Sequence, residues 1–310
     1  MKAVRYHSYG DSSVLVFEDA DRPAAGAGQL VIKVAGTAFN PADAAIRAGF
    51  LQEMLPLALP HIPNVDVAGV IVEVGEGVSG WQPGDAVVVF LPMAAPGAAA
   101  EYVAAPAELL AAAPRAVELA DAAALPAAGL TAWQMLFEVA GLKGGQSVLV
   151  NGAGGAVGGY AVQLGRQAGA TVTATGSARS RDRLRSYGID QVIDYTATPL
   201  PQAVAGQRFD VVLNLVTTTA EETAALAGLT ADGGTFVSAT TPGPDDPGRG
   251  VRTTQVFVRS DAAQLAGLVA RVDAGELKVS VAERRPLADL PAVHARADAG
   301  QLPGRTILVP

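Results

Sequence analysis

The sequence predicts an α/β protein made of a β-rich lobe and a doubly wound parallel sheet. Apolar β-branched segments alternate with helical segments in the middle of the chain, which is typical of a parallel sheet covered by helices. The residues before this region read as short strands separated by turns. We therefore expect one domain formed by residues 1–117 and 260–310, and a second formed by residues 118–259.

Composition narrows the class of protein. Half of the 310 residues are hydrophobic, which is enough for two cores. The net charge of -8 disfavours a general nucleic-acid surface. No apolar run approaches the roughly 20 residues that span a bilayer, and Met1–Tyr6 reads as a strand rather than a signal peptide. We expect a cytoplasmic protein with neither a nucleic acid nor a membrane as partner.

The metal-ligating residues are few. The chain has no cysteine, which removes disulfides, thiolate nucleophiles and cysteine-liganded zinc sites. Its three histidines, His7, His61 and His294, are far apart in the sequence, with no paired carboxylate beside them. We expect no metal site.

The first lobe is built from β-branched segments. Residues 29–36, 67–75 and 86–90 are expected to be strands, because valine and isoleucine are frequent in them and glycine-containing turns bound them. Residues 302–309 read as a further strand that returns to this lobe.

The second domain is expected to hold the parallel sheet. Its strands are predicted over residues 148–151, 171–175, 191–194, 210–215 and 235–239, with a last strand over 251–258. Helical segments separate most of them, and residues 261–275 have helical spacing beyond the last strand. Such sheets bind ligands at the carboxyl ends of their strands.

A glycine cluster follows the first of these strands. Counted from Ala153, the pattern is A-x-G-x-x-G through Gly155 and Gly158; counted from Gly152, Val157 takes the last glycine place. A strand, a glycine turn and a helix start form a cradle for pyrophosphate, although a plain strand-to-helix connection has the same composition. The β-branched segment 171–175 completes a βαβ unit and favours a dinucleotide site. The predicted cofactor contacts here are Asn151, Gly152, Ala153, Gly154, Gly155, Ala156, Val157 and Gly158.

The residues after the second strand select the nucleotide. An acidic residue there would bind a free ribose 2′-hydroxyl, but the segment 176–181 contains none. It offers the hydroxyl of Ser177 and the guanidinium groups of Arg179 and Arg181, which suit a 2′-phosphate. NADPH is therefore favoured over NADH. The alternative is that Arg179, Arg181, Arg183 and Arg185 form a solvated helix face.

Several motifs together resemble one family. Nearly the whole chain resembles the medium-chain dehydrogenase/reductase superfamily, specifically its zinc-free quinone oxidoreductase branch. The matching segments, in order, are Phe39–Asp43, Pro63–Ile71, Gly84–Val87, Ala124–Ala132, the glycine turn, residues 188–195 and Gly304–Leu308. The resemblance implies a GroES-like catalytic domain and a Rossmann domain, with the active site in a cleft between them.

Departures from the zinc alcohol dehydrogenases are informative. Where those relatives carry a cysteine ligand this chain has Asn40, and where they carry a histidine ligand Val65 precedes Asp66. The cysteine-rich structural-zinc lobe is missing too. Without a Lewis acid, alcohol oxidation is disfavoured. The resemblance instead implies hydride transfer from NADPH to a quinone or to the β-carbon of an α,β-unsaturated carbonyl. An enoyl reductase of a biosynthetic pathway and a non-catalytic NADPH-binding partner protein are the alternatives.

The resemblance also implies site residues. Asn40 would donate a hydrogen bond to the developing oxyanion, Asp43 would lie beside the nicotinamide and substrate, and Thr131 would contact the nicotinamide ribose or carboxamide. Each has a structural alternative: Asn40 shapes a turn, Asp43 caps the next helix, and Thr131 caps a helix starting at Ala132. Some relatives carry a tyrosine two residues beyond the aspartate, and Ala45 excludes that proton donor here.

The remaining contacts follow strand ends or apolar segments. Phe50 and Met54 belong to an apolar stretch that is either a wall for a small hydrophobic acceptor or a buried loop. Phe257 is either core or part of a lid over the nicotinamide. Members of the branch commonly form homodimers, so we expect one here. The further predicted cofactor contacts are Asn214, Val216, Ser238, Thr240, Phe257 and Val258.

Overall fold

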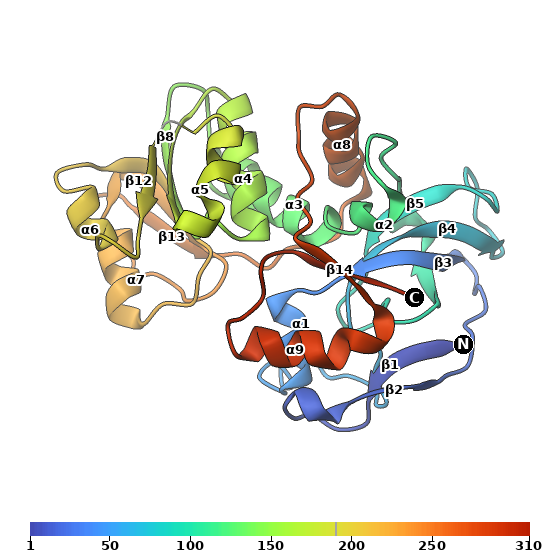
Figure 1. Ribbon diagram of the computed structural model, residues 1–310. Coiled ribbons are helices and arrows are strands. Elements are labelled where there is room, and N and C mark those ends of the chain that lie inside the picture. Colours follow the sequence, from blue (N-terminus) through green and yellow to red (C-terminus); the bar gives the residue numbers. More distant parts are fainter. Residues whose placement is uncertain (190) are drawn as a thin grey trace. The chain divides into compact units, whose positions relative to one another are not determined.

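A computed structural model of the chain describes residues 1–189 and 191–310 (Figure 1). Asp190, which falls in the motif 188–195, lies outside the described residues. The chain divides into two compact units, the first formed by residues 1–127 and 260–310 and the second by residues 128–259. No helix in the described part of the chain is long and apolar enough to cross a membrane.

The second unit contains a parallel sheet of six strands within the described residues. Their order is β10-β9-β8-β11-β12-β13, and every neighbouring pair is parallel. β9 and β10 follow β8 toward one edge of the sheet, and β11, β12 and β13 then follow toward the other edge. This is the Rossmann strand order 3-2-1-4-5-6. The strands are β8 (Ser147–Asn151), β9 (Thr171–Gly176), β10 (Gln191–Asp194), β11 (Phe209–Asn214), β12 (Thr230–Ser238) and β13 (Arg252–Gln255).

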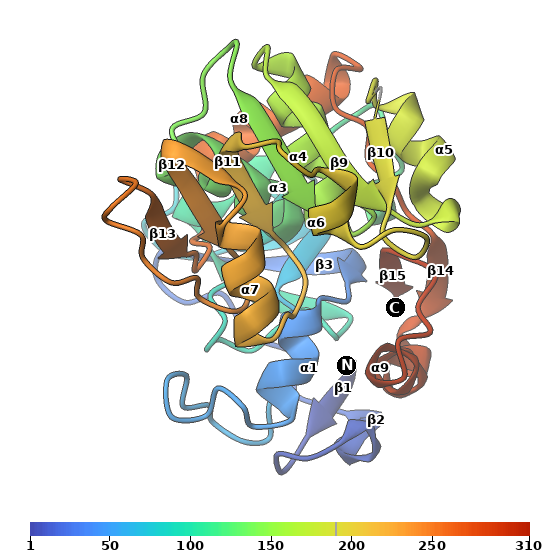
Figure 2. The same cartoon turned by 90° about the vertical axis from the view of Figure 1, so that its left-hand side faces the viewer.

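Helices cover both faces of this sheet. Figure 1 shows α4 and α5 on one side and α6 and α7 on the other, and Figure 2 shows the strands behind α6 and α7. The core beneath α6 and α7 includes Leu149, Val212 and Phe236, all fully buried. The helical segments are α3 (Pro126–Trp133), a π-helical turn over Gln134–Val139, α4 (Ala156–Gln167), α5 (Ala178–Ser186), α6 (Leu200–Ala203) and α7 (Ala220–Ala227).

The first unit is β-rich. A sheet of order β14-β15-β3-β4-β5-β7, with β6 also paired to β3, packs over a core that includes Leu30, Ile71 and Val89. The strands of this unit are β1 (Lys2–Tyr6), β2 (Leu15–Asp19), β3 (Gln29–Ala38), β4 (Asp66–Val74), β5 (Ala86–Phe90), β6 (Tyr102–Pro106), β7 (Ala111–Ala112), β14 (Glu283–Pro286) and β15 (Thr306–Val309). Its helices are α1 (Pro41–Arg47), α2 (Leu119–Ala122), α8 (Ala262–Asp273) and α9 (Leu290–Asp298), with 3₁₀ turns at 12–14, 107–109 and 287–289.

The C-terminal strand closes this unit. β15 pairs antiparallel with β3, with Ile307 opposite Ala38, and β3 pairs antiparallel with β4. The predicted return of the tail to the first lobe is confirmed. The three adjacent strands bring the residues just before β15, just after β3 and at the start of β4 to one edge of the sheet.

The predicted strands of both units are confirmed, most with small changes at their ends; the tail strand predicted over 302–309 covers only 306–309, and the strand predicted over 235–239 begins at residue 230. The last predicted strand, over 251–258, is shorter because only the residues of β13 pair with β12. The helix after the glycine turn begins at Ala156, directly after the turn.

Candidate functional site

The glycine turn lies where the order of strands reverses. β8 and β11 are neighbours, and the chain leaves them toward opposite edges of the sheet, so their carboxyl ends form the switch point at which such sheets bind ligands. Gly152 follows β8 with φ of 94°, a conformation that favours glycine. Its N–H donates a 2.8 Å hydrogen bond to Thr175 Oγ1 at the end of β9. Gly155 is the N-cap of α4.

Gly158 is needed for packing rather than for contact with a ligand. A Cβ there would lie 2.4 Å from Gly152 O and 2.5 Å from the Cα of Ala153, so α4 approaches the turn too closely for a side chain. Gly158 and Ala153 are buried, whereas Gly155 is exposed and Gly152, Gly154, Ala156 and Val157 are half-buried. The cradle therefore fits a pyrophosphate through the accessible turn residues.

A polar network joins three strand ends below this turn. Asn151 Nδ2 donates to Asn214 Oδ1 at 3.0 Å, and Thr175 Oγ1 donates to Asn151 Oδ1 at 3.1 Å. Asn214 Nδ2 in turn donates to Thr218 Oγ1 at 3.0 Å. Asn214 is fully buried, so its side chain fixes the switch point instead of facing a ligand.

The next strand end is organised in the same way. Thr240 Oγ1 donates to the backbone oxygen of Val216 at 2.8 Å, and Ser238 Oγ accepts the N–H of Thr240 at 3.2 Å. Ser238 is fully buried, while Val216 is 39% exposed. Of the residues predicted from these two loops, Val216 and Thr240 are thus the accessible ones.

The arginines after β9 have different surroundings. Ser177 is the N-cap of α5. Arg181 Nη2 lies 2.6 Å from Asp194 Oδ2, at the end of β10. Arg183 Nη2 donates to the backbone oxygen of Gly154, so this guanidinium lies on the glycine turn itself. The alternative that the four arginines form a solvated helix face is wrong for Arg183, and its contact with the turn was not predicted.

Phe257 and Val258 belong to a segment that is held from one end. Gln134 Nε2 donates to the backbone oxygen of Arg259 at 2.9 Å, and Gln134 Oε1 accepts the N–H of Arg259 at 3.1 Å. The Arg259 side chain also pairs with Glu138 at 2.6 Å. Phe257 is 65% exposed, so the alternative that it belongs to the core is wrong. The sequence did not predict a role for Gln134, because the feature that distinguishes it, a place in a π-helical turn, is visible only in the structure.

In the first unit, Asn40 lies at the centre of a buried hydrogen-bonded group. Asn40 Nδ2 donates to Asp66 Oδ2 at 2.9 Å, and Arg305 Nη1 donates to Asn40 Oδ1 at 2.6 Å. Arg305 Nη2 donates to the same Asp66 oxygen at 2.5 Å. Asp66 is fully buried and Arg305 nearly so. The sequence contained both residues in matched motifs but gave no sign that they meet.

Backbone groups complete this cluster. Asp66 Oδ1 accepts the N–H of Ala127 at 2.7 Å, and Arg305 Nη1 also donates to the carbonyl oxygen of Phe39 at 3.0 Å. Thr37 Oγ1 donates to the backbone oxygen of Asp66 at 2.6 Å. These contacts satisfy both oxygens of Asp66 and both terminal nitrogens of Arg305, whereas the buried Nε of Arg305 has no hydrogen-bond partner.

Asp43 is held close to Asn40 by the start of α1. Its Oδ2 accepts the backbone N–H of Asn40 at 2.8 Å, as the N3 residue of a capping box. Asp43 therefore lies inside the first turn of α1, and the interpretation that it caps a helix following it is wrong. Burial raises the pKa of Asp43 to about 7, an effect that the Asn40 N–H opposes and the charge of Asp66 reinforces. Asn40 is the N-cap residue of α1.

The donor set around Asn40 does not fit zinc. The guanidinium of Arg305 occupies oxygen atoms of both Asn40 and Asp66, and a cation at those oxygens would face a fixed positive charge. Among residues 1–189 and 191–310, no three histidine, aspartate or glutamate side chains form a group able to hold a metal ion. Protein zinc sites are tetrahedral, with thiolate, histidine-nitrogen or carboxylate-oxygen ligands, at least three of them from the protein.

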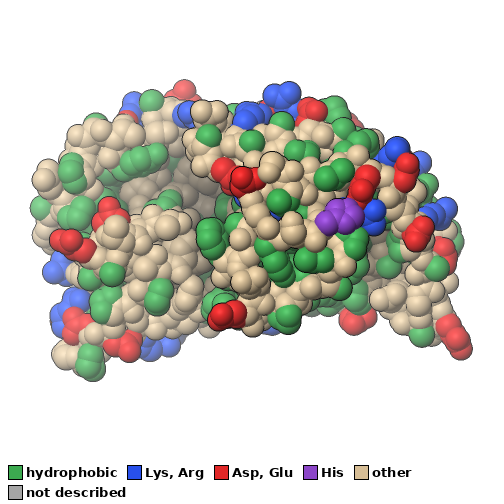
Figure 3. All heavy atoms as spheres, turned by 90° about the horizontal axis from the view of Figure 1, so that it is seen from below, with side chains coloured by type: hydrophobic (Ala, Val, Ile, Leu, Met, Phe, Trp, Pro, Cys, Tyr) green, Lys and Arg blue, Asp and Glu red, His purple; other side chains and the backbone are tan. Residues whose placement is uncertain are grey.

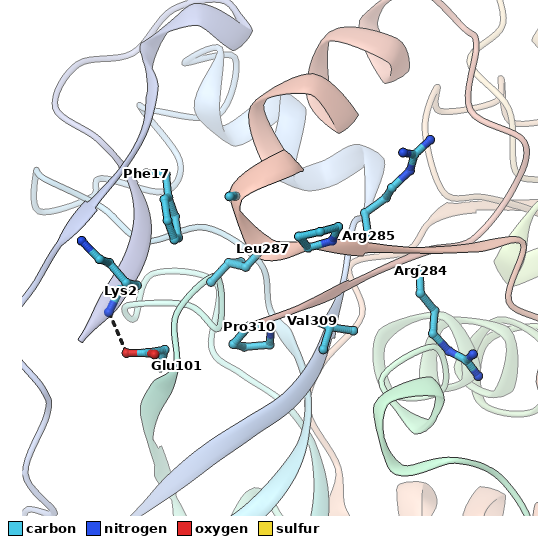
Figure 4. A pocket seen from close by; sticks show the side chains of 10 residues that line it. Lys2, Phe17, Glu101, Arg284, Arg285, Leu287, Val309 and Pro310 are labelled. Atoms are coloured by element: carbon cyan, nitrogen blue, oxygen red, sulfur yellow. Dashed lines mark hydrogen bonds between the residues drawn. The ribbon is translucent and has the colours of Figure 1, made fainter.

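The other predicted residues lie elsewhere. Phe50 and Met54 are 83% and 65% exposed, so the alternative that they form a buried loop is wrong. Thr131 lies inside α3, two residues before its end, so it does not cap a helix starting at Ala132. A cavity of about 490 Å³ in the first unit is lined by residues such as Lys2, Phe17 and Arg284, and by none of the predicted site residues (Figure 4).

Charged side chains of both signs share the surface of the described residues in Figure 3, where acidic and basic groups are interspersed over the face that it draws. Beside the cavity of Figure 4, Arg284 is paired with Asp121 at 2.6 Å and Lys2 with Asp19 at 3.0 Å.

Comparisons with known proteins agree with this geometry. Residues 26–115 match the alcohol dehydrogenase GroES-like domain, and residues 187–308 match a family described as zinc-binding dehydrogenase. A chloroplast envelope quinone oxidoreductase homolog of Arabidopsis thaliana is 40% identical over 223 residues, covering 69% of this chain and 68% of the relative. An NADPH-dependent alkenal/one oxidoreductase of the same plant is 38% identical over 226 residues, covering 70% and 57%.

A solved structure has the same fold over its full length. The quinone oxidoreductase from Coxiella burnetii superposes with a TM-score of 0.89 at 26% identity, covering 100% of this chain and 99% of that one. With these relatives, the GroES-like unit and the Rossmann unit define an oxidoreductase that binds a nicotinamide cofactor. The chain belongs to the medium-chain dehydrogenase/reductase superfamily, in its quinone oxidoreductase branch.

Proposed function

We propose that the chain is a zinc-independent, NADPH-dependent reductase of quinones or α,β-unsaturated carbonyl compounds. The observation that carries the proposal is the hydrogen-bonded group of Asn40, Asp66 and Arg305, in which Asn40 stands at the position where the zinc relatives carry a cysteine ligand. A conjugated acceptor accepts negative charge on its own oxygen, so an amide N–H suffices where an alcohol would require a Lewis acid.

The preference for NADPH is supported by the residues beside β9. No acidic residue follows β9 up to Arg181, whereas Ser177 begins α5 and two arginines lie in its first turns. These groups would bind a 2′-phosphate, and the glycine turn would bind the pyrophosphate. The name of the Arabidopsis alkenal/one oxidoreductase specifies the same nucleotide.

The proposed reaction needs little acid or base catalysis from the chain. NADPH, when bound, supplies a hydride. Asn40 donates a hydrogen bond to the acceptor oxygen, where charge develops in the transition state. Thr131, Val216 and the segment of Phe257 and Val258 would hold the nicotinamide, and Phe50 and Met54 would supply apolar surface for the acceptor. The proton that completes the reduction comes from solvent, because Ala45 provides no donor.

Two alternative functions share features with the proposed one. An enoyl reductase acting in biosynthesis would use the same hydride geometry, and a protein that binds NADPH without turnover would keep the same glycine turn. The homodimer and the cytoplasmic location stay predictions.

Steady-state assays separate these functions. The purified protein should oxidise NADPH in the presence of quinones or enones, with a kcat/KM at least tenfold higher than with NADH, and chelator should not reduce the rate. Fluorescence titration that detects NADPH binding without turnover on quinones, enones and enoyl thioesters would favour the non-catalytic alternative. Turnover confined to enoyl thioesters would favour the enoyl reductase.

A further inference from the structure

We propose that Arg305 and Asp66 are positioning residues that fix the orientation of the Asn40 side-chain amide, so that one Nδ2–H faces the acceptor oxygen. The inference rests on the proposed function, because it assigns the groups that prepare Asn40 for that role. Neither side chain is exposed enough to be a contact for the acceptor: Asp66 is fully buried and Arg305 is 6% exposed.

The two charged groups leave the amide one orientation. Arginine carries only donors and an ionised carboxylate only acceptors. Arg305 must therefore face Asn40 Oδ1, and Asp66 must face Asn40 Nδ2, which is the arrangement seen at 2.6 Å and 2.9 Å. Rotating the amide by 180° would place an N–H against the guanidinium and an oxygen against the carboxylate. Asparagine amides without such partners are free to present either atom.

One hydrogen of the amide then remains for a ligand. Nδ2 has two hydrogens, and Asp66 accepts one of them. Nδ2 also lies 3.5 Å from the carbonyl oxygen of Ala38, which is the weak limit of hydrogen bonding. Asn40 as a residue is half-buried rather than enclosed, and the proposal assigns this second N–H to the acceptor oxygen. An oriented donor of fixed position is what stabilises a developing oxyanion most effectively.

The rest of the cluster holds the two charged groups in turn. Asp66 also accepts the N–H of Ala127 at 2.7 Å, and Arg305 also donates to the carbonyl oxygen of Phe39 at 3.0 Å. The planar fork of the guanidinium spans Asn40 and Asp66 with separate nitrogens. A lysine ammonium in its place would keep the charge but lack the fork.

The test is a double-mutant cycle between Asn40 and Arg305. Asn40→Ala should lower kcat by about 100-fold or more, the cost of losing one oxyanion donor. Arg305→Lys should lower kcat by roughly tenfold and leave the KM for the acceptor within about twofold, because the fork is lost but the charge is kept. In the Asn40→Ala background, Arg305→Lys should have no further effect beyond about twofold, because the group through which it acts is gone.

A matched control is Arg47→Lys. Arg47 is also buried in the first unit and pairs with Asp298 at 3.0 Å, but no hydrogen bond joins it to the Asn40 amide. This variant should change the melting temperature as Arg305→Lys does and keep kcat within about twofold. A merely structural role for Arg305 would lower kcat equally in both Asn40 backgrounds, and that result would overturn the inference.

A measurement without substrate separates this inference from the proposed function. In ¹⁵N-labelled wild-type protein, the two Asn40 Nδ2–H resonances, assigned by their loss in Asn40→Asp, should be well separated, with the one bonded to Asp66 more protected from exchange than the other. In Arg305→Lys they should broaden or converge, because the amide can then rotate. An unchanged pair would overturn the positioning role even if the protein reduces quinones. A changed pair in a protein that reduces no acceptor would leave the orienting contact standing and refute the proposed function instead.

Discussion

The carboxylate of Asp43 accepts the backbone N–H of Asn40 at 2.8 Å while lying almost wholly out of water. Burial is the larger effect and raises the pKa of Asp43 to about 7. Asp66 is a second carboxylate near it, and Arg305 is the opposing positive charge. The folded protein therefore binds a proton at Asp43 that the unfolded chain would release near pH 4.

The first prediction concerns pH and stability. Between about pH 4 and pH 7 the native state binds more protons at Asp43 than the unfolded state, so this group makes the protein less stable as pH rises, by up to about 1.4 kcal/mol per pH unit. Asp43→Asn should remove that slope. Denaturant unfolding of both proteins at several pH values should show the variant gaining stability relative to the wild type as pH rises through this window.

The wild type must be compared with Asp43→Asn because two buried histidines change the stability with pH in the opposite direction to Asp43. Burial lowers the pKa of His61 to about 4 and, with Arg47, that of His294 to about 3. Their protonation in the unfolded chain lowers stability as pH falls below 6.5. A difference between wild type and Asp43→Asn that is the same at every pH would contradict the raised pKa of Asp43.

The second prediction concerns two adjacent glycines of α4. Gly158→Ala should strongly destabilise the protein and weaken cofactor binding, because its Cβ would lie 2.4 Å from the backbone oxygen of Gly152. Gly159→Ala is the control: its Cβ would meet only Tyr187 at 3.6 Å, an ordinary contact, and alanine favours helix. Melting temperatures should fall for Gly158→Ala and stay level or rise for Gly159→Ala. Equal effects would refute the close approach.

The third prediction concerns the nucleotide. Arg181→Gln should raise the Kd for NADPH by about tenfold and leave the Kd for NADH nearly unchanged, because a charge-assisted hydrogen bond to the 2′-phosphate is lost. Arg185→Gln removes the same charge from the last turn of α5 and serves as the control. If both variants lose NADPH affinity equally, general electrostatic attraction accounts for the preference and Arg181 is not a specific contact.

The sequence predicted those parts of the protein whose conformation is determined by residues close to them along the chain. The parallel strands, the glycine turn and the helix after it depend on local composition, and the alternation of strand and helix predicts a doubly wound parallel sheet, whereas the strand order comes from the structure. Gly158 fitted the motif because the helix must approach the strand closely at that position.

Contacts between distant residues could not be read in the same way. Arg305 reaches Asn40 because β15 pairs with β3, and nothing near residue 305 indicates that partner. Phe257 was weighed as a core residue from its apolarity, but its segment is tied to Gln134 and leaves the ring exposed. Asn214 was expected to face the cofactor, and the network of strand ends buries it.

The fourth prediction concerns the hydrogen bonds between Gln134 and the backbone of Arg259. Gln134→Leu preserves volume but removes both hydrogen bonds to the backbone of Arg259, so the segment of Phe257 and Val258 should become mobile. We expect a few-fold higher Kd for NADPH and faster amide exchange at residues 256–260. Thr253→Val, which removes a hydroxyl from the edge strand β13, is the control. Unaltered exchange in Gln134→Leu would show that the segment is held by other contacts.

The central claim is that hydride passes from NADPH to a conjugated acceptor with no metal assisting. It is tested most directly by incubating chelator-treated protein with 4-deuterated NADPH and an α,β-unsaturated ketone, and locating the label by mass spectrometry and NMR. The account predicts deuterium at the β-carbon of the product, at a rate that added zinc does not raise and that Asn40→Ala lowers by about 100-fold. Activity that vanishes with the chelator and returns with zinc would contradict it, as would a reduced product without the label.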